Sequence, residues 1–354
     1  MTRYALLVST LLAGSGLAGT ALADAPKVVA SIKPVHSLVS AVMEGVGEPE
    51  LIVKGAGSPH TYSMKPSEAA AVGGAEIVFW VGGELEPFLR KPVETLGERA
   101  TVIELSKAHD LVTLSYRDDG PFETHEHDVE GSGGHDHDHA AADDHDHGEG
   151  HDHEEAEETP EHDHDHAHGS DEGGHDHHQA GAIDMHLWLD PANARVWVHE
   201  IAEALVAADP DNAQRYEANA EALTGRLTEL EEEIAAEIEP VKGRPFVVFH
   251  DAYQYFENRF DIRAAGSITV SPEVAPGAQR VSEMRDKIRK LGAACVFAEP
   301  QFEPRIVRTV IEGTEAKAGV LDPSGADLTD GPDLYFELMR GLTSSLSSCL
   351  SESS

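Results

Sequence analysis

The sequence is poor in basic residues. Its 354 residues include 26 Lys and Arg against 65 Asp and Glu, which gives a formal net charge of −39. Because no basic stripe is available to neutralise phosphates, nucleic acid is not an expected partner. The motifs GxxxxGK[ST] and HExxH are absent as well. The chain therefore offers neither a P-loop ATPase site nor the helical zinc site of a metalloprotease.

Long apolar runs are also absent after the N-terminus. Arg3 precedes an apolar stretch at residues 5–22, which is followed by Ala23 at the end of an A-x-A sequence. This pattern predicts a secretory signal peptide, residues 1–23, that is cleaved after about Ala23. No later segment offers about 18 to 20 uninterrupted apolar residues, and no Cys follows the apolar stretch as a lipid attachment site. We therefore expect a periplasmic chain without a membrane anchor.

Cysteine is almost missing, since the chain has only Cys295 and Cys349. An exported compartment allows the two to form a disulfide. Closing a loop of about 55 residues would stabilise the fold by roughly 4 kcal/mol in the chain-entropy model. Two separate buried thiols are the alternative.

Short apolar runs alternate with helix-like segments through most of the chain. The runs lie at 27–32, 75–81, 100–105, 246–249 and 294–298, and the helix-like segments at 34–43, 66–72, 85–96, 282–291, 305–318 and 334–350. Such alternation predicts an α/β fold with mostly parallel sheets. Residues 192–207 and 211–239 are rich in helix formers, and the second stretch would span about 40 Å as a rigid helix.

About 330 mature residues exceed the size of one hydrophobic core, so two domains are expected. We predict an N-terminal α/β lobe at 24–190, a helical region with a long linker helix at 191–240, and a C-terminal α/β lobe at 241–354.

Residues 118–178 interrupt the pattern with 23 Asp and Glu, 16 His and no Lys or Arg. So few large apolar residues cannot offset the entropy of ordering, which predicts a disordered loop without metal. Imidazoles two residues apart in a mobile chain favour several weak zinc sites, and we hypothesise that the loop collects or senses zinc. A solvated acidic spacer is the alternative. The candidate ligands in the loop are His135, His137, His139, His145, His147, His151, His153, His162, His164, His166, His168, His175, His177 and His178.

Six histidines lie outside this loop, and three of them have the setting of a metal ligand. His60 is in a turn rich in Gly and Pro, His186 is a polar residue in an apolar run, and His250 directly follows the strand-like run FVVF. Ligands of open α/β sheets bind at the carboxyl ends of strands. Asp322, which also follows a β-like run, is a fourth candidate, although a carboxylate before Pro is often only a turn former.

Capping, surface exposure and helix packing account for the remaining three histidines. These are His36, His109 and His199.

The motifs GAGSPHTYSMKPSE, DMHLWLDP, FHDAYQYFE, CVFAEPQF and VLDPSG extend over nearly the whole mature chain. Together they resemble the periplasmic zinc-binding proteins of high-affinity zinc importers, within the cluster A-1 metal-binding family. The resemblance implies three ligands, His60, His186 and His250, with Asp322 or water completing the shell. It also implies that the metal lies in a cleft between two lobes joined by a long helix, and that Cys295 pairs with Cys349.

The ligand types favour Zn(II) as the cargo. Manganese-specific relatives have Glu at the position of His250, whereas three imidazoles suit zinc, copper or nickel better than a hard ion. Some zinc-binding relatives have Glu immediately before the first His, where this chain has Pro59. A Glu ligand from that loop is thus excluded.

The resemblance implies a non-enzymatic monomer that delivers zinc to an importer, whose membrane permease and cytoplasmic ATPase are separate polypeptides. A zinc storage or scavenging protein and a metal-dependent adhesin are alternatives. A third is a zinc hydrolase, since three His with an open position also form a catalytic zinc shell. Glu299 would be its candidate general base.

Overall fold

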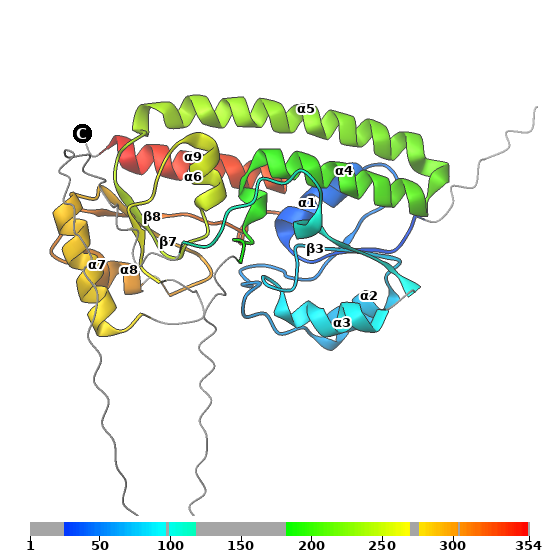
Figure 1. Ribbon diagram of the computed structural model, residues 1–354, viewed down its shortest axis with the longest axis horizontal. Helices are drawn as coiled ribbons and strands as arrows, with labels where there is room; N and C mark the ends of the chain where they lie inside the picture. The colour runs from blue at the N-terminus through cyan, green and yellow to red at the C-terminus, as the bar shows by residue number, and fades with distance from the viewer. Residues whose placement is uncertain (1–24, 97–98, 118–181, 270–275, 304, 353–354) are drawn as a thin grey trace, which may run out of the picture. The chain divides into compact units, whose positions relative to one another are not determined.

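The computed structural model describes residues 25–96, 99–117, 182–269, 276–303 and 305–352. They form two four-stranded sheets in which every strand pairing is parallel (Figure 1). The predicted signal peptide and the histidine-rich segment 118–178 lie outside the described residues. Within the described part of the chain, none of the helices combines the length and the apolar character needed to span a membrane.

The first sheet has the strand order β2-β1-β3-β4. Its strands are β1 (Val28–Ala30), β2 (Glu50–Leu51), β3 (Ile77–Trp80) and β4 (Thr101–Glu104). The helical elements of this lobe are α1 (Lys33–Val42), α2 (Pro66–Gly74), η1 (Pro87–Leu89), α3 (Arg90–Leu96) and η3 (Leu105–Lys107). The strands predicted at 27–32, 75–81 and 100–105 are confirmed. β2 was not predicted, because a two-residue strand has no periodicity.

The second sheet repeats this order as β6-β5-β7-β8. Its strands are β5 (Phe246–Val248), β6 (Gly266–Ser267), β7 (Cys295–Ala298) and β8 (Lys317–Val320), with helices α6 (Gln254–Phe260), α7 (Ala278–Leu291) and α8 (Arg305–Ile311). The helix predicted at 305–318 is wrong beyond Ile311. Gly313 has a φ of 72°, which turns the chain out of the helix, and β8 then pairs with β7.

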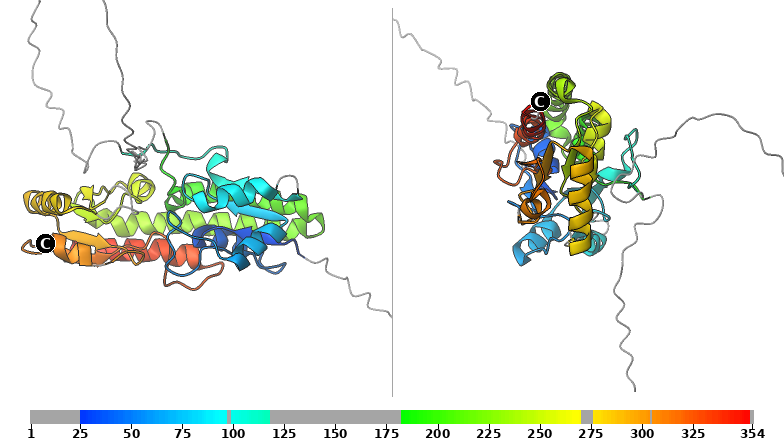
Figure 2. Two further views of the ribbon diagram at one scale, coloured as in Figure 1. Left: turned by 90° about the horizontal axis from the view of Figure 1, so that it is seen from below. Right: turned by 90° about the vertical axis from the view of Figure 1, so that its left-hand side faces the viewer.

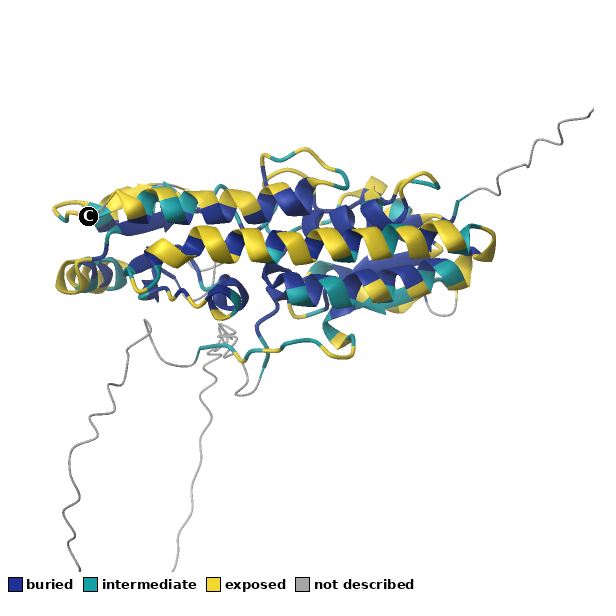
Figure 3. Ribbon diagram, turned by 90° about the horizontal axis from the view of Figure 1, so that it is seen from above, coloured by how far each residue is buried: buried dark blue, intermediate teal, exposed yellow. Residues whose placement is uncertain are grey.

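The chain between the two sheets is helical, and its long helix α5 contacts both lobes. The elements between the sheets are η4 (Leu187–Leu189), α4 (Pro191–Ala208), η5 (Pro210–Asn212), α5 (Ala213–Ile238) and η6 (Glu239–Val241). α5 has 26 residues and is about 39 Å long, which confirms the predicted long helix. One face of it buries Leu223, Leu227, Leu230 and Ile234, while the opposite face is exposed (Figure 3).

The terminal helix α9 (Leu334–Ser351) runs beside α5 (Figure 2) and also packs against α1 and β8. At its start, the backbone N–H of Tyr335 donates to the Ser37 hydroxyl of α1 at 2.9 Å. Near its end, a disulfide joins Cys349 to Cys295 of β7, as predicted. Residues of both lobes share one hydrophobic core, and a smaller second cluster lies between the second sheet and α7 and α8. The lobes are therefore held together by two helices rather than by one.

Lys33 joins the first lobe to the loop after β8. Its side chain is 5% exposed, and its ammonium group donates to the carbonyl oxygens of Gly325, Ala326 and Leu328 at 2.9 to 3.0 Å. Asp330 lies 3.3 Å from the same nitrogen. A buried ammonium is tolerated only with such a set of acceptors. The contacts fix the loop that begins at Asp322.

Candidate metal centre

The first candidate ligand, His60, lies in the loop between β2 and α2. Gly55 turns this loop with a φ of 62°, a conformation that favours glycine. The Tyr62 hydroxyl donates to Glu68 at 2.9 Å, and the backbone N–H of Lys65 donates to the other Glu68 oxygen at 2.7 Å. Glu68, in the first turn of α2, therefore anchors the loop next to His60.

His186 lies between an isolated β-bridge and η4. Ser115 and Ile183 form the bridge, and Asp184 follows it. The Asp184 side chain is fully buried and accepts hydrogen bonds from the backbone N–H of His186 at 3.0 Å and from its Nδ1 at 2.7 Å. Because an ionised carboxylate can only accept, Nδ1 bears the proton and Nε2 keeps a lone pair.

His250 follows β5 at the carboxyl end of the second sheet. The neighbouring strand β7 ends just before Glu299, whose carboxylate lies 2.7 Å from Nδ1 of His250. β5 and β7 are the strands between which the chain order of the sheet reverses, and ligands of open α/β sheets bind at this position. When this imidazole is neutral, its proton lies on Nδ1, which faces the carboxylate, and Nε2 has the lone pair.

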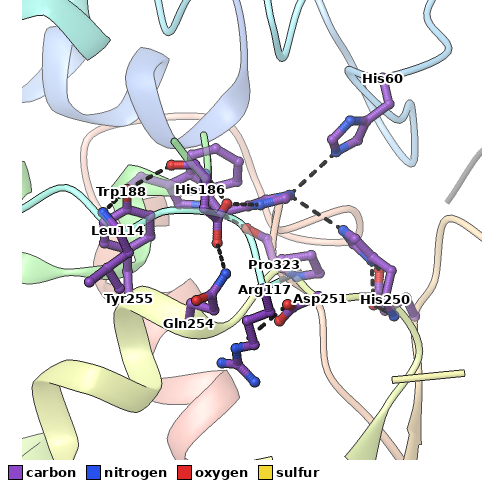
Figure 4. Close-up of polar contacts among 12 residues, drawn as sticks. His60, Leu114, Arg117, His186, Trp188, His250, Asp251, Gln254, Tyr255 and Pro323 are labelled. Atoms are coloured by element: carbon purple, nitrogen blue, oxygen red, sulfur yellow. Dashed lines mark hydrogen bonds and ion pairs between the residues drawn. The ribbon is translucent and has the colours of Figure 1, made fainter. Parts of the chain in front are cut away.

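The three imidazoles converge (Figure 4). Nε2 of His186 lies 3.3 Å from Nε2 of His60 and 3.4 Å from Nε2 of His250. One ligand atom from each of the three lies within 4.8 Å of the others, and among the described residues this is the one such group of three or more potential ligands. Two nitrogens at about 2.05 Å from a tetrahedral zinc ion are themselves about 3.4 Å apart. The observed spacing thus fits the edge of a zinc coordination tetrahedron.

The electrostatic setting favours a cation. His186 and His250 are 3% and 4% exposed, and Asp184 and Glu299 are 0% and 2% exposed. Burial lowers the pKa of the His250 imidazole, but the charge and hydrogen bond of Glu299 outweigh it, so this pKa lies above its ordinary value. Without metal, a proton on His250 can therefore occupy the space that a zinc ion would take.

A cavity beside the three rings is lined by residues of both lobes. They are Ser58, Pro59, His60, His186, Trp188, His250, Glu299, Gln301, Phe302, Pro323 and Ser324. The Trp188 indole N–H donates to the Pro323 carbonyl at 2.7 Å, which connects the two lobes at the cavity wall.

Asp322 is not a member of the group of converging ligands. Its carboxylate accepts hydrogen bonds from the backbone N–H groups of Ser324, Gly325 and Ala326 and from the Gln301 amide. In this arrangement both of its oxygens are engaged in holding the loop.

The other histidines outside 118–178 do not join the group either. His36 is buried, and its Nε2 lies 3.1 Å from the Pro49 carbonyl oxygen. His109 is exposed. The side chain of His199 is 76% exposed and pairs with Glu203, so the packing role expected for it is wrong.

Two functional positions were missed or misjudged from the sequence. Asp184 was not considered, although its spacing two residues before His186 is a usable signal. Glu299 was considered only as the general base of a hydrolase. The structure places its carboxylate at Nδ1 of His250, on the side of the ring away from the converging Nε2 atoms.

The fold and the site together define a two-lobed α/β protein with three converging histidines between the lobes, in an arrangement that could hold a metal ion. A family model described as the periplasmic component A of the zinc-uptake complex, ZnuA, matches residues 28–349. The chain belongs to this family, which consists of solute-binding proteins of zinc uptake rather than enzymes.

Similarities to individual proteins agree with this assignment. The high-affinity zinc uptake system protein ZnuA of Brucella suis biovar 1 is 53% identical over 349 residues, which cover 98% of each chain. A crystal structure of ZnuA has a TM-score of 0.67 at 20% identity, with 92% of this chain and 99% of that chain covered. The laminin-binding adhesin Lmb of Streptococcus agalactiae also has a TM-score of 0.67, at 22% identity, with 92% and 99% covered. These two structures show the fold alone.

The raised pKa of His250 predicts how zinc affinity depends on pH. A proton competes with zinc for this ring below the pKa of the metal-free protein. As the pH is lowered, affinity should therefore begin to fall before pH 6.5 is reached, by up to about tenfold per pH unit for each proton displaced. Glu299→Gln removes the charge that raises this pKa and should move the fall to lower pH. Competition titrations with a chelator between pH 5.5 and 8.5 measure both curves.

Glu203→Gln is the matched control, because it removes a carboxylate beside the exposed His199. It should leave the curve unchanged. Superimposable curves for Glu299→Gln and the unmodified chain would show that Glu299 does not tune the site.

Proposed function

We propose that His60, His186 and His250 bind one Zn(II) ion through their Nε2 atoms. The observation that supports this most directly is the short distance between the ring nitrogens: Nε2 of His186 lies 3.3 Å from Nε2 of His60 and 3.4 Å from Nε2 of His250. Facing acceptors repel unless a cation or a proton lies between them. Three imidazole ligands, with carboxylates hydrogen-bonded to the Nδ1 atoms of two of them, are the usual surroundings of zinc in proteins.

We assign the fourth coordination position to water rather than to Asp322. Four N–H donors already occupy the Asp322 carboxylate, and turning it toward the metal would leave three backbone N–H groups of its loop without this acceptor. In this proposal Asp322 shapes the cavity wall that Pro323 and Ser324 form.

Ligand substitutions test this assignment. His60→Ala, His186→Ala and His250→Ala should each weaken zinc binding by at least about 100-fold, since losing a ligand costs more than losing a hydrogen bond to one. Asp322→Asn should weaken it by less than about tenfold. The measurement is chelator competition on the metal-stripped full chain. His199→Ala, an exposed histidine, serves as control and should bind normally. Tight binding by any of the three ligand variants would refute the ligand set, and a large effect of Asp322→Asn would return Asp322 to the coordination shell.

As a member of the zinc-uptake family, the chain is a periplasmic component that captures zinc for import. We propose further that it delivers the ion as a monomer to a membrane permease, and that the ATPase is a separate polypeptide. The absence of a P-loop motif from the sequence supports the second part. Storage or adhesion would use the same fold, as the likeness to the Lmb adhesin illustrates.

Growth under zinc chelation separates import from storage. Cells without the gene should stop growing when zinc is chelated, and the unmodified chain should restore growth. The His186→Ala variant, expressed to the same level, should not. If cells lacking the gene grew as well as the parent under chelation, a storage or adhesive role would be favoured.

We also propose that the histidine-rich segment 118–178, which lies outside the described residues, collects zinc through several weak sites. Its imidazoles stand two residues apart, and 23 carboxylates accompany them without a single basic residue. Each weak site must order the backbone around it, so its affinity should lie well below that of the three converging histidines.

Deleting residues 118–178 should therefore reduce the number of weakly bound zinc ions while leaving one tight site. Equilibrium dialysis with a metal assay measures both numbers. Replacing the 16 histidines of the segment with Asn keeps its length and formal charge, and should give the same loss. If the Asn variant still held the weak ions, the segment would act as an acidic spacer instead.

A further inference from the structure

The short helix α6 contacts the chain on both sides of the histidine-rich segment. It begins four residues after His250, so it is covalently close to one of the three rings. Before the segment, the backbone N–H of Tyr116 donates to the Ala182 carbonyl that follows it, at 3.1 Å, and the Asp184 N–H donates to the Leu114 carbonyl at 2.8 Å. The two chain ends thus form a small ladder, which we call the stem, residues 114–117 and 182–184.

The Tyr255 hydroxyl of α6 completes this ladder. It accepts a hydrogen bond from the Leu114 N–H at 3.1 Å and donates one to the Asp184 carbonyl at 2.7 Å (Figure 4). Tyr255 is fully buried. One hydroxyl group therefore holds both strands of the stem to the C-terminal lobe.

Gln254, the first residue of α6, holds the Asp184 side chain. Its amide nitrogen donates to Oδ2 at 3.2 Å, while Oδ1 accepts from Nδ1 of His186 (Figure 4). Because one oxygen faces the amide and the other faces the imidazole, the plane of the carboxylate is fixed. The orientation of the His186 ring depends on that plane.

A third contact attaches the other strand of the stem to the same helix. The Arg117 guanidinium donates to Glu257 at 2.6 Å and lies 3.6 Å from Asp251, the residue after His250. Arg117, Asp251 and Glu257 are 14%, 12% and 4% exposed in their side chains. All three contacts therefore join the stem to the segment that begins at His250.

From this arrangement we propose that Tyr255 and Gln254 are positioning residues for zinc binding. This proposal rests on the ligand set proposed above. Through Asp184 they hold the His186 ring at the distance and angle from His250 that one metal ion requires. The two rings come from different lobes, and this path through α6 and Asp184 joins them within a few residues. Neither residue touches the metal.

Removing the hydroxyl or the amide alone tests the proposal in the full chain. Tyr255→Phe and Gln254→Met keep the size of the side chains, and each should weaken zinc binding by about tenfold, as expected when the support of a ligand is lost. Both should also shift the visible absorption bands of the Co(II)-substituted protein, which report the geometry of the ligands around the ion. A residue that only stabilises the fold would lower the melting temperature without moving these bands.

Tyr216→Phe is the matched control. Tyr216 is equally buried, and its hydroxyl donates to the Asp209 carboxylate at 2.9 Å, within the α4–α5 region. It should lose stability and keep the zinc affinity and the Co(II) spectrum of the unmodified chain.

His186→Ala, measured alongside, separates this proposal from the one on which it rests. If His186→Ala loses tight binding while Tyr255→Phe and Gln254→Met keep the affinity and the Co(II) bands unchanged, the positioning role is wrong and the ligand set stands. If His186→Ala binds tightly, the ligand set is wrong and the positioning role falls with it. An equal loss of affinity in Tyr216→Phe and Tyr255→Phe would reduce the effect to general destabilisation and overturn the positioning role.

Discussion

Three imidazole nitrogens with their lone pairs directed at one another impose the main constraint on this structure. His186 Nε2 approaches the other two to 3.3 and 3.4 Å, a spacing that repulsion between acceptors would open if the rings were free to turn. Asp184 and Glu299 oppose that turning at two of the rings by accepting the Nδ1 protons. These carboxylates fix the orientation of two of the three converging rings, and the rest of the protein must hold the positions of these side chains.

The fold meets this requirement by connecting distant segments repeatedly. His60, His186 and His250 come from a loop, a bridge region and a strand end, and the last belongs to a different sheet from the first. α5 and α9 pack along both lobes, and Lys33 and Trp188 of the first lobe hold the loop after β8. The Cys295–Cys349 disulfide attaches the far end of α9 to the second sheet. A hinge motion that opened the lobes widely would break several of these contacts at once. Small movements of single ligand segments would therefore change the site at a lower cost in free energy.

The candidate ligands could be predicted from the sequence where the residues around a histidine are unusual. His250 directly after the apolar run FVVF indicated a ligand at the carboxyl end of a strand, and the glycine-rich turn around His60 indicated a fixed loop. Glu299 was visible but its role was not, because a contact across 49 residues has no local pattern. The same limit applies to α9, since an amphipathic helix does not reveal which elements cover its apolar face. The helix predicted at 305–318 extended into the first two residues of β8 (Lys317–Val320), although a β-like run was expected just before Asp322. In the structure Gly313 ends the helix and β8 pairs with β7.

Charge balance gives a reason for two buried carboxylates behind the rings. In the proposed site, a zinc ion on three neutral imidazoles would have two positive charges among buried side chains, and the carboxylates of Asp184 and Glu299 would supply two negative ones. Without metal, the same carboxylates are an excess of buried negative charge, and the charge and hydrogen bond of Glu299 raise the pKa of His250 in spite of its burial. Zinc and the proton thus compete for the same lone pairs, and the carboxylates that orient the rings also set the strength of that competition. Because the compensating charges lie behind the proposed ligands and not among them, the proposed site does not need a carboxylate at the fourth position of the metal, which water would occupy. An incoming ligand can then reach the ion before any bond between the metal and the protein has been broken.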